Sequence, residues 1–195
     1  MKLPMLFTAA LLACACAFGR AAAADDAQDF DAWIQAHPVG ELESFLAQDQ
    51  LNGVVPTRDL LRTATDWQRC GGPRFELPPR DHWPALKQVL RLVAELKKRG
   101  ILRDVEGASA YRNARLNACA HGAPRSAHTL SYALDITADP DQVDVPRLCR
   151  FWRDEGQRWK MGLSRYPSGR IHLDASGWRT WGADHTRRTS FCLEH

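Results

Sequence analysis

Beyond its first 24 residues, the 195-residue sequence lacks any long apolar run, any internal repeat and any linker rich in glycine or serine. A helix that spans a membrane needs about 20 consecutive apolar residues, so no membrane span is expected in that part. Without a repeat or a flexible linker, the sequence does not indicate a solenoid or a chain of separate domains. It predicts one compact domain with a core of its own.

The sequence also lacks a strong excess of charge. It contains 26 basic and 23 acidic residues, which gives a formal charge of +3. Lys2 and Arg20 lie within the first 24 residues, so 24 basic residues against 23 acidic ones leave +1 for the remainder. Proteins that bind nucleic acid usually carry a strongly basic surface. We therefore expect no nucleic-acid partner, and we expect a monomer.

The first 24 residues are typical of a signal peptide that is removed on export. Lys2 supplies the positive charge, residues 3–18 form an apolar run, and three alanines at residues 22–24 suit a cleavage site. A periplasmic or secreted location is expected. Leu-Leu-Ala-Cys at residues 11–14 loosely resembles the box that precedes a lipidated cysteine, so a lipoprotein anchor at Cys14 is an alternative.

Four cysteines follow the first 24 residues, and none of them belongs to a Cys-x-x-Cys pair. Zinc sites made of cysteines usually contain such pairs, whereas an even number of cysteines in an exported chain predicts disulfides. Two disulfides are expected, and the sequence leaves three pairings open. The cysteines concerned are Cys70, Cys119, Cys149 and Cys192.

Hydrophobic periodicity predicts several helices and a few short strands. The clearest helix runs from about Trp83 to Arg99, with Pro84 in its first turn and Gly100 after its end. Other helices are expected within residues 30–47, 57–67 and 145–159, and strands over 133–137, 161–166 and 170–174, the last two joined by a hairpin turn. The predicted fold class is α+β, with helices packed on a small antiparallel sheet. The predicted organisation is a signal peptide over 1–24, a helical extension over 25–66 and a main domain over 67–195.

His128 and Asp135 lie in one short segment that leads into a predicted strand. A neutral imidazole and a carboxylate are suitable ligands for Zn²⁺, and a catalytic zinc site usually takes three protein ligands and leaves one position open. His172 is the best third candidate, because strand alternation puts it on one face with Asp174, opposite two apolar neighbours. Taken singly, however, histidines are more often structural than metal-binding.

These motifs together resemble the zinc D-Ala-D-Ala carboxypeptidase and murein endopeptidase family over residues 67–181. The family pattern Ser-x-His-x-x-Gly-x-Ala-x-Asp is present with one change, Ser131 in place of the glycine, which implies a slightly different turn. The other matching segments are Ser-Ala-Tyr-Arg at 109–112, Tyr-Pro-Ser at 166–168 and Ile-His-Leu-Asp at 171–174.

The resemblance implies a fold, a metal and a substrate. The fold is that of the hedgehog signalling domain and the vancomycin-resistance D,D-dipeptidases, so residues 67–195 are expected to be a zinc peptidase domain. One zinc ion would be held by His128, Asp135 and His172, and Arg112 would contact the substrate. The substrates would be peptidoglycan peptides, cleaved by a D,D- or L,D-endopeptidase or by a D-Ala-D-Ala carboxypeptidase.

The general base is the role that the resemblance leaves unfilled. The family's dipeptidases carry a glutamate three residues before the last zinc ligand, and Gly169 occupies that position here. Asp174 is the predicted replacement, with the orientation of a metal ligand as its alternative role. His121 is a third option. If no group serves as base, the chain would be a non-catalytic zinc-containing module that binds the cell wall.

Two further residues are expected to bind substrate. Ser126 can orient a ligand or a substrate group through its hydroxyl, although a structural role in a turn is an alternative. Trp178 and Trp181 can pack against the sugar or peptide of a substrate, although tryptophans are as often part of a core.

Overall fold

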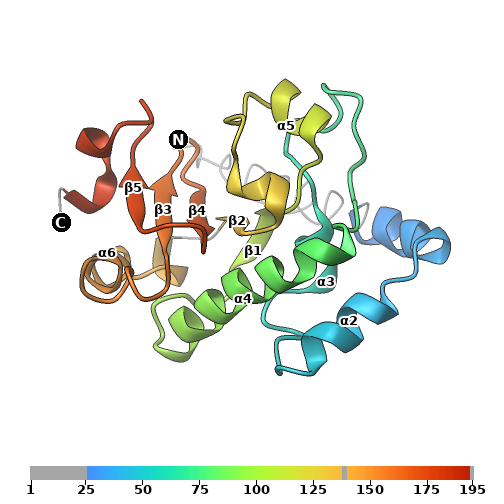
Figure 1. Cartoon of the computed structure of the whole chain (residues 1–195), viewed down its shortest axis with the longest axis horizontal. Helices are drawn as coiled ribbons and strands as arrows, with labels where there is room; N and C mark the ends of the chain where they lie inside the picture. The colour runs from blue at the N-terminus through green and yellow to red at the C-terminus, as the bar shows by residue number, and fades with distance from the viewer. Residues whose placement is uncertain (1–25, 138–139, 194–195) are drawn as a thin grey trace, which may run out of the picture. The chain divides into compact units, whose positions relative to one another are not determined.

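The structure is a computed structural model that describes residues 26–137 and 140–193 (Figure 1). The predicted signal peptide and Cys14 lie outside the described residues. The described chain divides after Pro38 into two compact units. The first contains a helix over residues 26–36, and the second contains all later elements. Among the described residues, no helix combines the length and the apolar character needed to cross a membrane.

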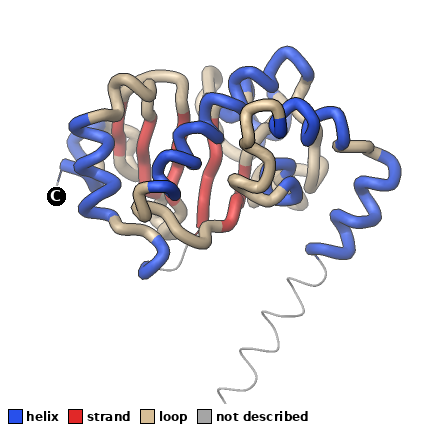
Figure 2. Tube along the Cα trace, turned by 90° about the horizontal axis from the view of Figure 1, so that it is seen from below, coloured by secondary structure: helices blue, strands red, loops and turns tan. Residues whose placement is uncertain are grey.

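A five-stranded sheet lies at the centre of the second unit, with its strands side by side and helices around them (Figure 2). The strand order is β1-β2-β4-β3-β5. All neighbouring strands are antiparallel except β3 and β5, which are parallel. The strands are β1 (Glu106–Ser109), β2 (Ala133–Thr137), β3 (Gly162–Arg165), β4 (Ile171–Asp174) and β5 (Arg179–Trp181).

The prediction of a small sheet packed with helices is confirmed, but the prediction that the sheet is antiparallel throughout is wrong. Asp174, the last residue of β4, lies opposite Gly162, the first residue of β3. The chain then crosses this end of β3 and begins β5 with Arg179, which also pairs with Gly162. Because β5 starts beside the start of β3, the two strands run in the same direction.

The helices agree in part with the prediction. The longest one, α4, begins at Trp83 as predicted and ends at Lys98, one residue before the predicted end. The helix predicted over 57–67 is wrong beyond Leu61, because the chain becomes extended at Arg62 and forms backbone hydrogen bonds with residues 74 and 76. The α-helices of the second unit are α2 (Gly40–Ala47), α3 (Thr57–Leu61), α4 (Trp83–Lys98), α5 (Ala114–Cys119) and α6 (Val145–Asp154). Short 3-10 helices are η1 (Arg80–His82), η2 (Ala127–Leu130), η3 (Pro140–Gln142), η4 (Arg187–Thr189) and η5 (Phe191–Leu193).

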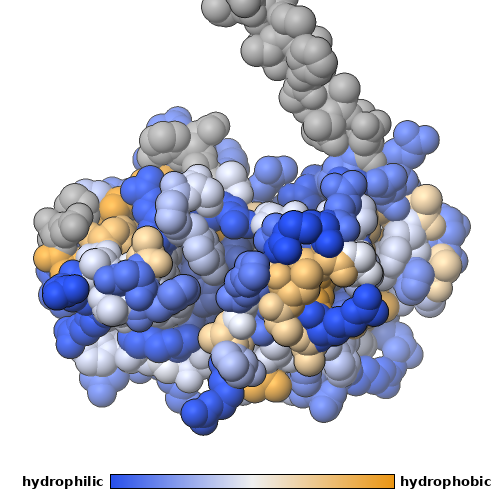
Figure 3. Space-filling view, turned by 90° about the horizontal axis from the view of Figure 1, so that it is seen from above, coloured by the Kyte–Doolittle hydropathy of each residue, from blue (hydrophilic) through white to orange (hydrophobic). Residues whose placement is uncertain are grey.

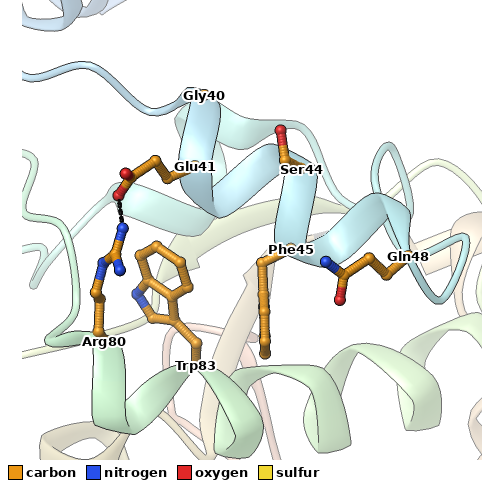
Figure 4. Close-up of a pocket in the computed structure, with 7 residues that line it drawn as sticks. All are labelled: Gly40, Glu41, Ser44, Phe45, Gln48, Arg80 and Trp83. Carbon is orange, nitrogen blue, oxygen red and sulfur yellow. Dashed lines mark hydrogen bonds and ion pairs between the residues drawn. The ribbon is translucent and has the colours of Figure 1, made fainter.

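The compact unit that contains the sheet begins at Val39, ahead of the boundary expected at residue 66. Helix α2 packs on the start of α4, where the rings of Phe45 and Trp83 have centroids 5.4 Å apart. Glu41 and Arg80 form an ion pair at the edge of the pocket between these helices (Figure 4). Residues 39–66 therefore belong to the same compact unit as the sheet.

Two disulfides join segments that are distant in the sequence. They pair Cys70 with Cys119 and Cys149 with Cys192, which settles the choice among the three pairings that the sequence left open. The linked cysteines are 49 and 43 residues apart. In the chain-entropy treatment, closing loops of this length stabilises the folded state by roughly 4 kcal/mol per disulfide. Two disulfides are also consistent with an exported protein.

Candidate metal centre

Three buried side chains from different elements meet at one point. His128 comes from η2, Asp135 from β2 and His172 from β4, and their relative exposures are 2%, 0% and 4%. Asp135 and His172 face each other because they are paired in the antiparallel β2–β4 ladder. The structure thus brings together the three residues predicted as metal ligands.

The donor atoms of the three side chains form a tight triangle. His128 Nε2 lies 3.2 Å from both Asp135 Oδ1 and His172 Nδ1, and His172 Nδ1 lies 2.9 Å from Asp135 Oδ1. Ligand bonds of about 2.0–2.2 Å at tetrahedral angles separate donor atoms by about 3.3–3.6 Å. The triangle needs to open by only a few tenths of an ångström, so the cluster can hold a metal ion.

Each imidazole is oriented by an acceptor on its outer side. The Nδ1 of His128 lies 2.6 Å from the carbonyl oxygen of Ala110. A carbonyl oxygen can only accept a hydrogen bond, so this nitrogen carries the proton and Nε2 presents a lone pair. The Nε2 of His172 lies 3.0 Å from Asp174 Oδ2, which leaves the lone pair of His172 Nδ1 directed at the cluster. Such outer acceptors fix the tautomer of metal-binding histidines.

The ionisation of the cluster suits a cation. Burial and the nearby charge of Arg112 lower the pKa of His128 to about 4. Burial alone would raise the pKa of Asp135, but both histidines lower it well below its ordinary value. Burial lowers the pKa of His172, and the hydrogen bonds to Asp135 and Asp174 outweigh this and raise it. Of the two histidines, His172 therefore holds a proton more tightly than His128 when no metal is bound.

Asp174 lies behind His172 and away from the cavity. Its carboxylate is fully buried, contacts His172 and accepts hydrogen bonds from Arg179 Nη2 (2.7 Å) and from the backbone N–H (2.8 Å) and hydroxyl (2.6 Å) of Ser176. Burial raises the pKa of Asp174, but His172 and Arg179 lower it overall. This geometry matches the orienting role given to Asp174 as an alternative, and Asp174 does not belong to the described lining of the cavity.

The metal centre opens into a cavity of about 430 Å³. Figure 3 shows this face of the molecule, with a hollow bordered by hydrophilic side chains. His128 and His172 line the cavity, and so do Arg112, Ser126 and His121. The Nη2 of Arg112 donates to Asp135 Oδ2 over 2.5 Å, so this arginine touches both the cluster and the cavity. Ser126 also caps η2, where its hydroxyl accepts from the His128 N–H over 3.3 Å.

Trp178 is the predicted substrate residue that the structure does not bring to the cavity. Its ring stacks on Trp152 with centroids 5.4 Å apart, and its indole N–H donates to the Trp152 carbonyl. Trp181 lines the cavity instead, with its ring centroid 5.1 Å from that of His172. Trp181 is the last residue of β5, whereas Trp178 lies before that strand begins.

Several cavity residues were not identified as site residues from the sequence. Tyr166 was noted only as part of a motif. Arg179 lies two positions before Trp181 in β5, so alternation along this three-residue edge strand was the only signal that both side chains lie on the same face. The others belong to loops or to a 3-10 helix of three residues, which are too short to give a periodic signal. These residues are Arg125, His185 and Arg187.

Comparison of the chain with protein-family models, with curated proteins and with solved structures found no match.

Ser131 provides a first test of the local fold. It ends η2 in the left-handed conformation, with φ 60° and ψ 20°, at the position where the family pattern has glycine, and its buried hydroxyl has no hydrogen-bond partner among the described residues. Glycine adopts this conformation without the steric cost of a Cβ. Ser131→Gly should therefore raise the free energy of unfolding in urea by about 1 kcal/mol. Gln50→Gly, at an exposed position with φ 57°, is the control for the backbone effect alone. A loss of stability in Ser131→Gly would contradict this account of the turn.

Gly162 provides a second test, because a Cβ at this position would overlap Asp174, whose Cγ would be 2.5 Å away. Gly162→Ala should displace the carboxylate that orients His172 and lower metal affinity about 10–100-fold, as loss of such outer partners does. Isothermal titration with Zn²⁺ measures this. Gly177→Ala is the matched control, because its nearest new contact is Arg179 Nη1 at 3.5 Å. Equal affinities in the two variants would show that Asp174 does not position the ligand.

Proposed function

We propose that the chain is a zinc-dependent peptidase that hydrolyses peptide bonds of peptidoglycan, as an endopeptidase or a D-Ala-D-Ala carboxypeptidase. The family resemblance of the segments around His128, Asp135 and His172 supports the substrate class. The two disulfides and the export signal expected in the first 24 residues suit a protein that works where peptidoglycan lies.

The observation that carries the proposal is a three-ligand cluster that faces a cavity. Among the described histidine, cysteine and acidic residues, no fourth side chain joins His128, Asp135 and His172. Structural zinc sites are usually closed by four protein ligands, whereas catalytic sites have three and leave one position for water or substrate. Two imidazoles and one carboxylate form a ligand set that suits zinc.

His128, Asp135 and His172 would hold the zinc ion, which would supply an activated water molecule as nucleophile and a Lewis acid for the scissile carbonyl. Arg112 donates through Nε to Ser109 and through Nη2 to Asp135, which leaves further N–H groups of its guanidinium for a substrate carbonyl or carboxylate. The Tyr166 hydroxyl lies 3.3 Å from Asp135 Oδ1. Burial, and next the charge of Asp135, raise its pKa, so Tyr166 remains a hydrogen-bond donor at the edge of the cavity.

We assign proton transfer to a histidine of the cavity, since no carboxylate belongs to its described lining. His121 and His185 both line the cavity and both adopt the left-handed conformation, with φ 59° and 60°. This conformation is uncommon outside glycine and often occurs at functional sites. Histidine is the side chain most often used as a general base.

The same lack of a lining carboxylate favours a second candidate function, a non-catalytic zinc-containing module that binds the cell wall. In that case the cavity would hold a peptide without cleaving it. Binding of one zinc ion is expected for both functions, so turnover is the property that separates them.

Digestion of purified peptidoglycan tests the proposed function. Zinc-loaded protein should release fragments cut at a peptide bond, and chelator-stripped protein should not, with the products identified by mass spectrometry. His172→Ala should reduce the rate at least about 100-fold, since even the loss of an outer partner of a ligand costs 10–100-fold. His37→Ala, at an exposed position in the first unit, should behave as wild type. One tightly bound zinc without any fragments would instead favour the binding module.

Zinc affinity should depend on pH through His172. Metal binding requires deprotonated ligands, and the raised pKa of His172 means that a proton competes with zinc at pH values below it. His128, with a pKa of about 4, stays deprotonated throughout this window. Between the pKa of His172 and about pH 4, zinc affinity should fall about tenfold for each unit by which the pH is lowered. In this range, each zinc ion that binds should release one proton from the protein. Calorimetry in buffers of different ionisation enthalpy counts the protons; a pH-independent affinity in this window would contradict the assignment.

A further inference from the structure

The charges that line the cavity are unbalanced. Its described lining contains four arginines, Arg112, Arg125, Arg179 and Arg187, and no acidic residue. The two buried carboxylates beneath it pair with two of them: Asp135 with Arg112 and Asp174 with Arg179. Two positive charges therefore remain without an opposite charge, even before a metal ion adds its own.

Arg125 and Arg187 are the arginines that carry this excess. Both are exposed, and neither forms an ion pair with any residue that the structure describes. Arg125 precedes η2, and Arg187 lies in η4, after β5. The sheet order places β5 on the side of β4 away from β2, so the two arginines reach the cavity from segments on different sides of β4 (Figure 1).

Both segments are held in place, although neither is part of an α-helix or a strand. The segment of Arg125 follows Cys119, which is bonded to Cys70, and the Asn117 side chain donates to the carbonyl of Ala123 over 3.0 Å. The segment of Arg187 precedes Cys192, which is bonded to Cys149. It is also tied to β5 by the hydrogen bond between the hydroxyls of Thr180 and Ser190, 2.5 Å long. Arg125 and Arg187 thus extend from segments whose backbone is held by disulfides and hydrogen bonds.

We infer that Arg125 and Arg187 bind a carboxylate of the substrate, so that the cavity takes anionic peptides with a free carboxylate near the cleaved bond. A guanidinium binds a carboxylate through two parallel hydrogen bonds, which gives both attraction and orientation. An uncharged peptide in the cavity would offer no negative charge to the guanidinium groups of Arg125 and Arg187. The inference rests on the proposed function, because it describes the substrate of the same site.

The carboxylate can be the C-terminus of the peptide or an acidic group within it, and matched substrates distinguish the two. One pair is a D-Ala-D-Ala peptide and its C-terminal amide. The other is a stem peptide with isoglutamate and the same peptide with isoglutamine. Zinc-loaded protein should cleave one acidic member with a KM about tenfold lower than that of its amide. The pair that shows the difference identifies which carboxylate is bound.

Arg125→Gln and Arg187→Gln should each raise the KM for the acidic peptide about tenfold, change kcat less than twofold and remove the preference over the amide. Arg115→Gln and Arg188→Gln are the matched controls, because both are exposed arginines that do not line the cavity. Cleavage with the same KM for acid and amide in wild type and in both variants would overturn the inference and leave the peptidase intact.

Binding separates a failure of the inference from a failure of the proposed function. If zinc-loaded protein cleaves none of the four peptides, the peptidase proposal fails for these substrates. Calorimetric titration of the same peptides then still tests the arginines. Tighter binding of an acidic peptide that Arg125→Gln and Arg187→Gln abolish would support the carboxylate site, and equal binding of acid and amide would overturn it.

Discussion

The pairing of Asp135 with His172 across β2 and β4 is the interaction on which the candidate site depends. It places a carboxylate and an imidazole side by side in a fully buried position, where each would be costly without a partner. His128 joins them from η2, and Asp174 and Ala110 accept the outer protons of the two imidazoles. Every polar group in this arrangement serves to present lone pairs at one point, which is the electrostatic requirement for holding a cation.

The surrounding backbone keeps that point in place. Gly162 leaves room for the Asp174 carboxylate on the neighbouring strand, and Arg179 from β5 neutralises it. Ser131 makes the tight turn that sends the chain from η2 into β2, so that His128 and Asp135 can face each other across a few residues. A left-handed residue and a buried carboxylate both cost free energy, which the contacts of the surrounding fold must offset. The arrangement that they allow could hold a metal ion.

The sequence predicted the centre of the site better than its walls. Composition was sufficient to predict β2, and the turn residues 167–169 predicted the hairpin between β3 and β4. Strand alternation then predicted the direction of His172. The edge strand β5 escaped prediction because it has only three residues, and the parallel direction depends on where the chain crosses β3. Loops and a short 3-10 helix contain Arg125, His185 and Arg187. Such segments have no hydrophobic periodicity from which the direction of a side chain could be predicted. The role of Asp174 as base stays a prediction; that its carboxylate lies beside His172 and outside the described lining of the cavity could not be predicted without coordinates.

The two disulfides link the redox state of the protein to the order of the segments that border the cavity. Each one tethers one of the two irregular segments that border it, after Cys119 and before Cys192. In a reducing compartment neither bond forms, and both segments keep the freedom of long open loops. The three candidate metal ligands lie on the sheet and on η2, whereas the segments of Arg125 and Arg187 are held by one disulfide each together with hydrogen bonds such as Asn117–Ala123 and Thr180–Ser190. Reduction of the two disulfides would therefore loosen the borders of the cavity more than the cluster of His128, Asp135 and His172.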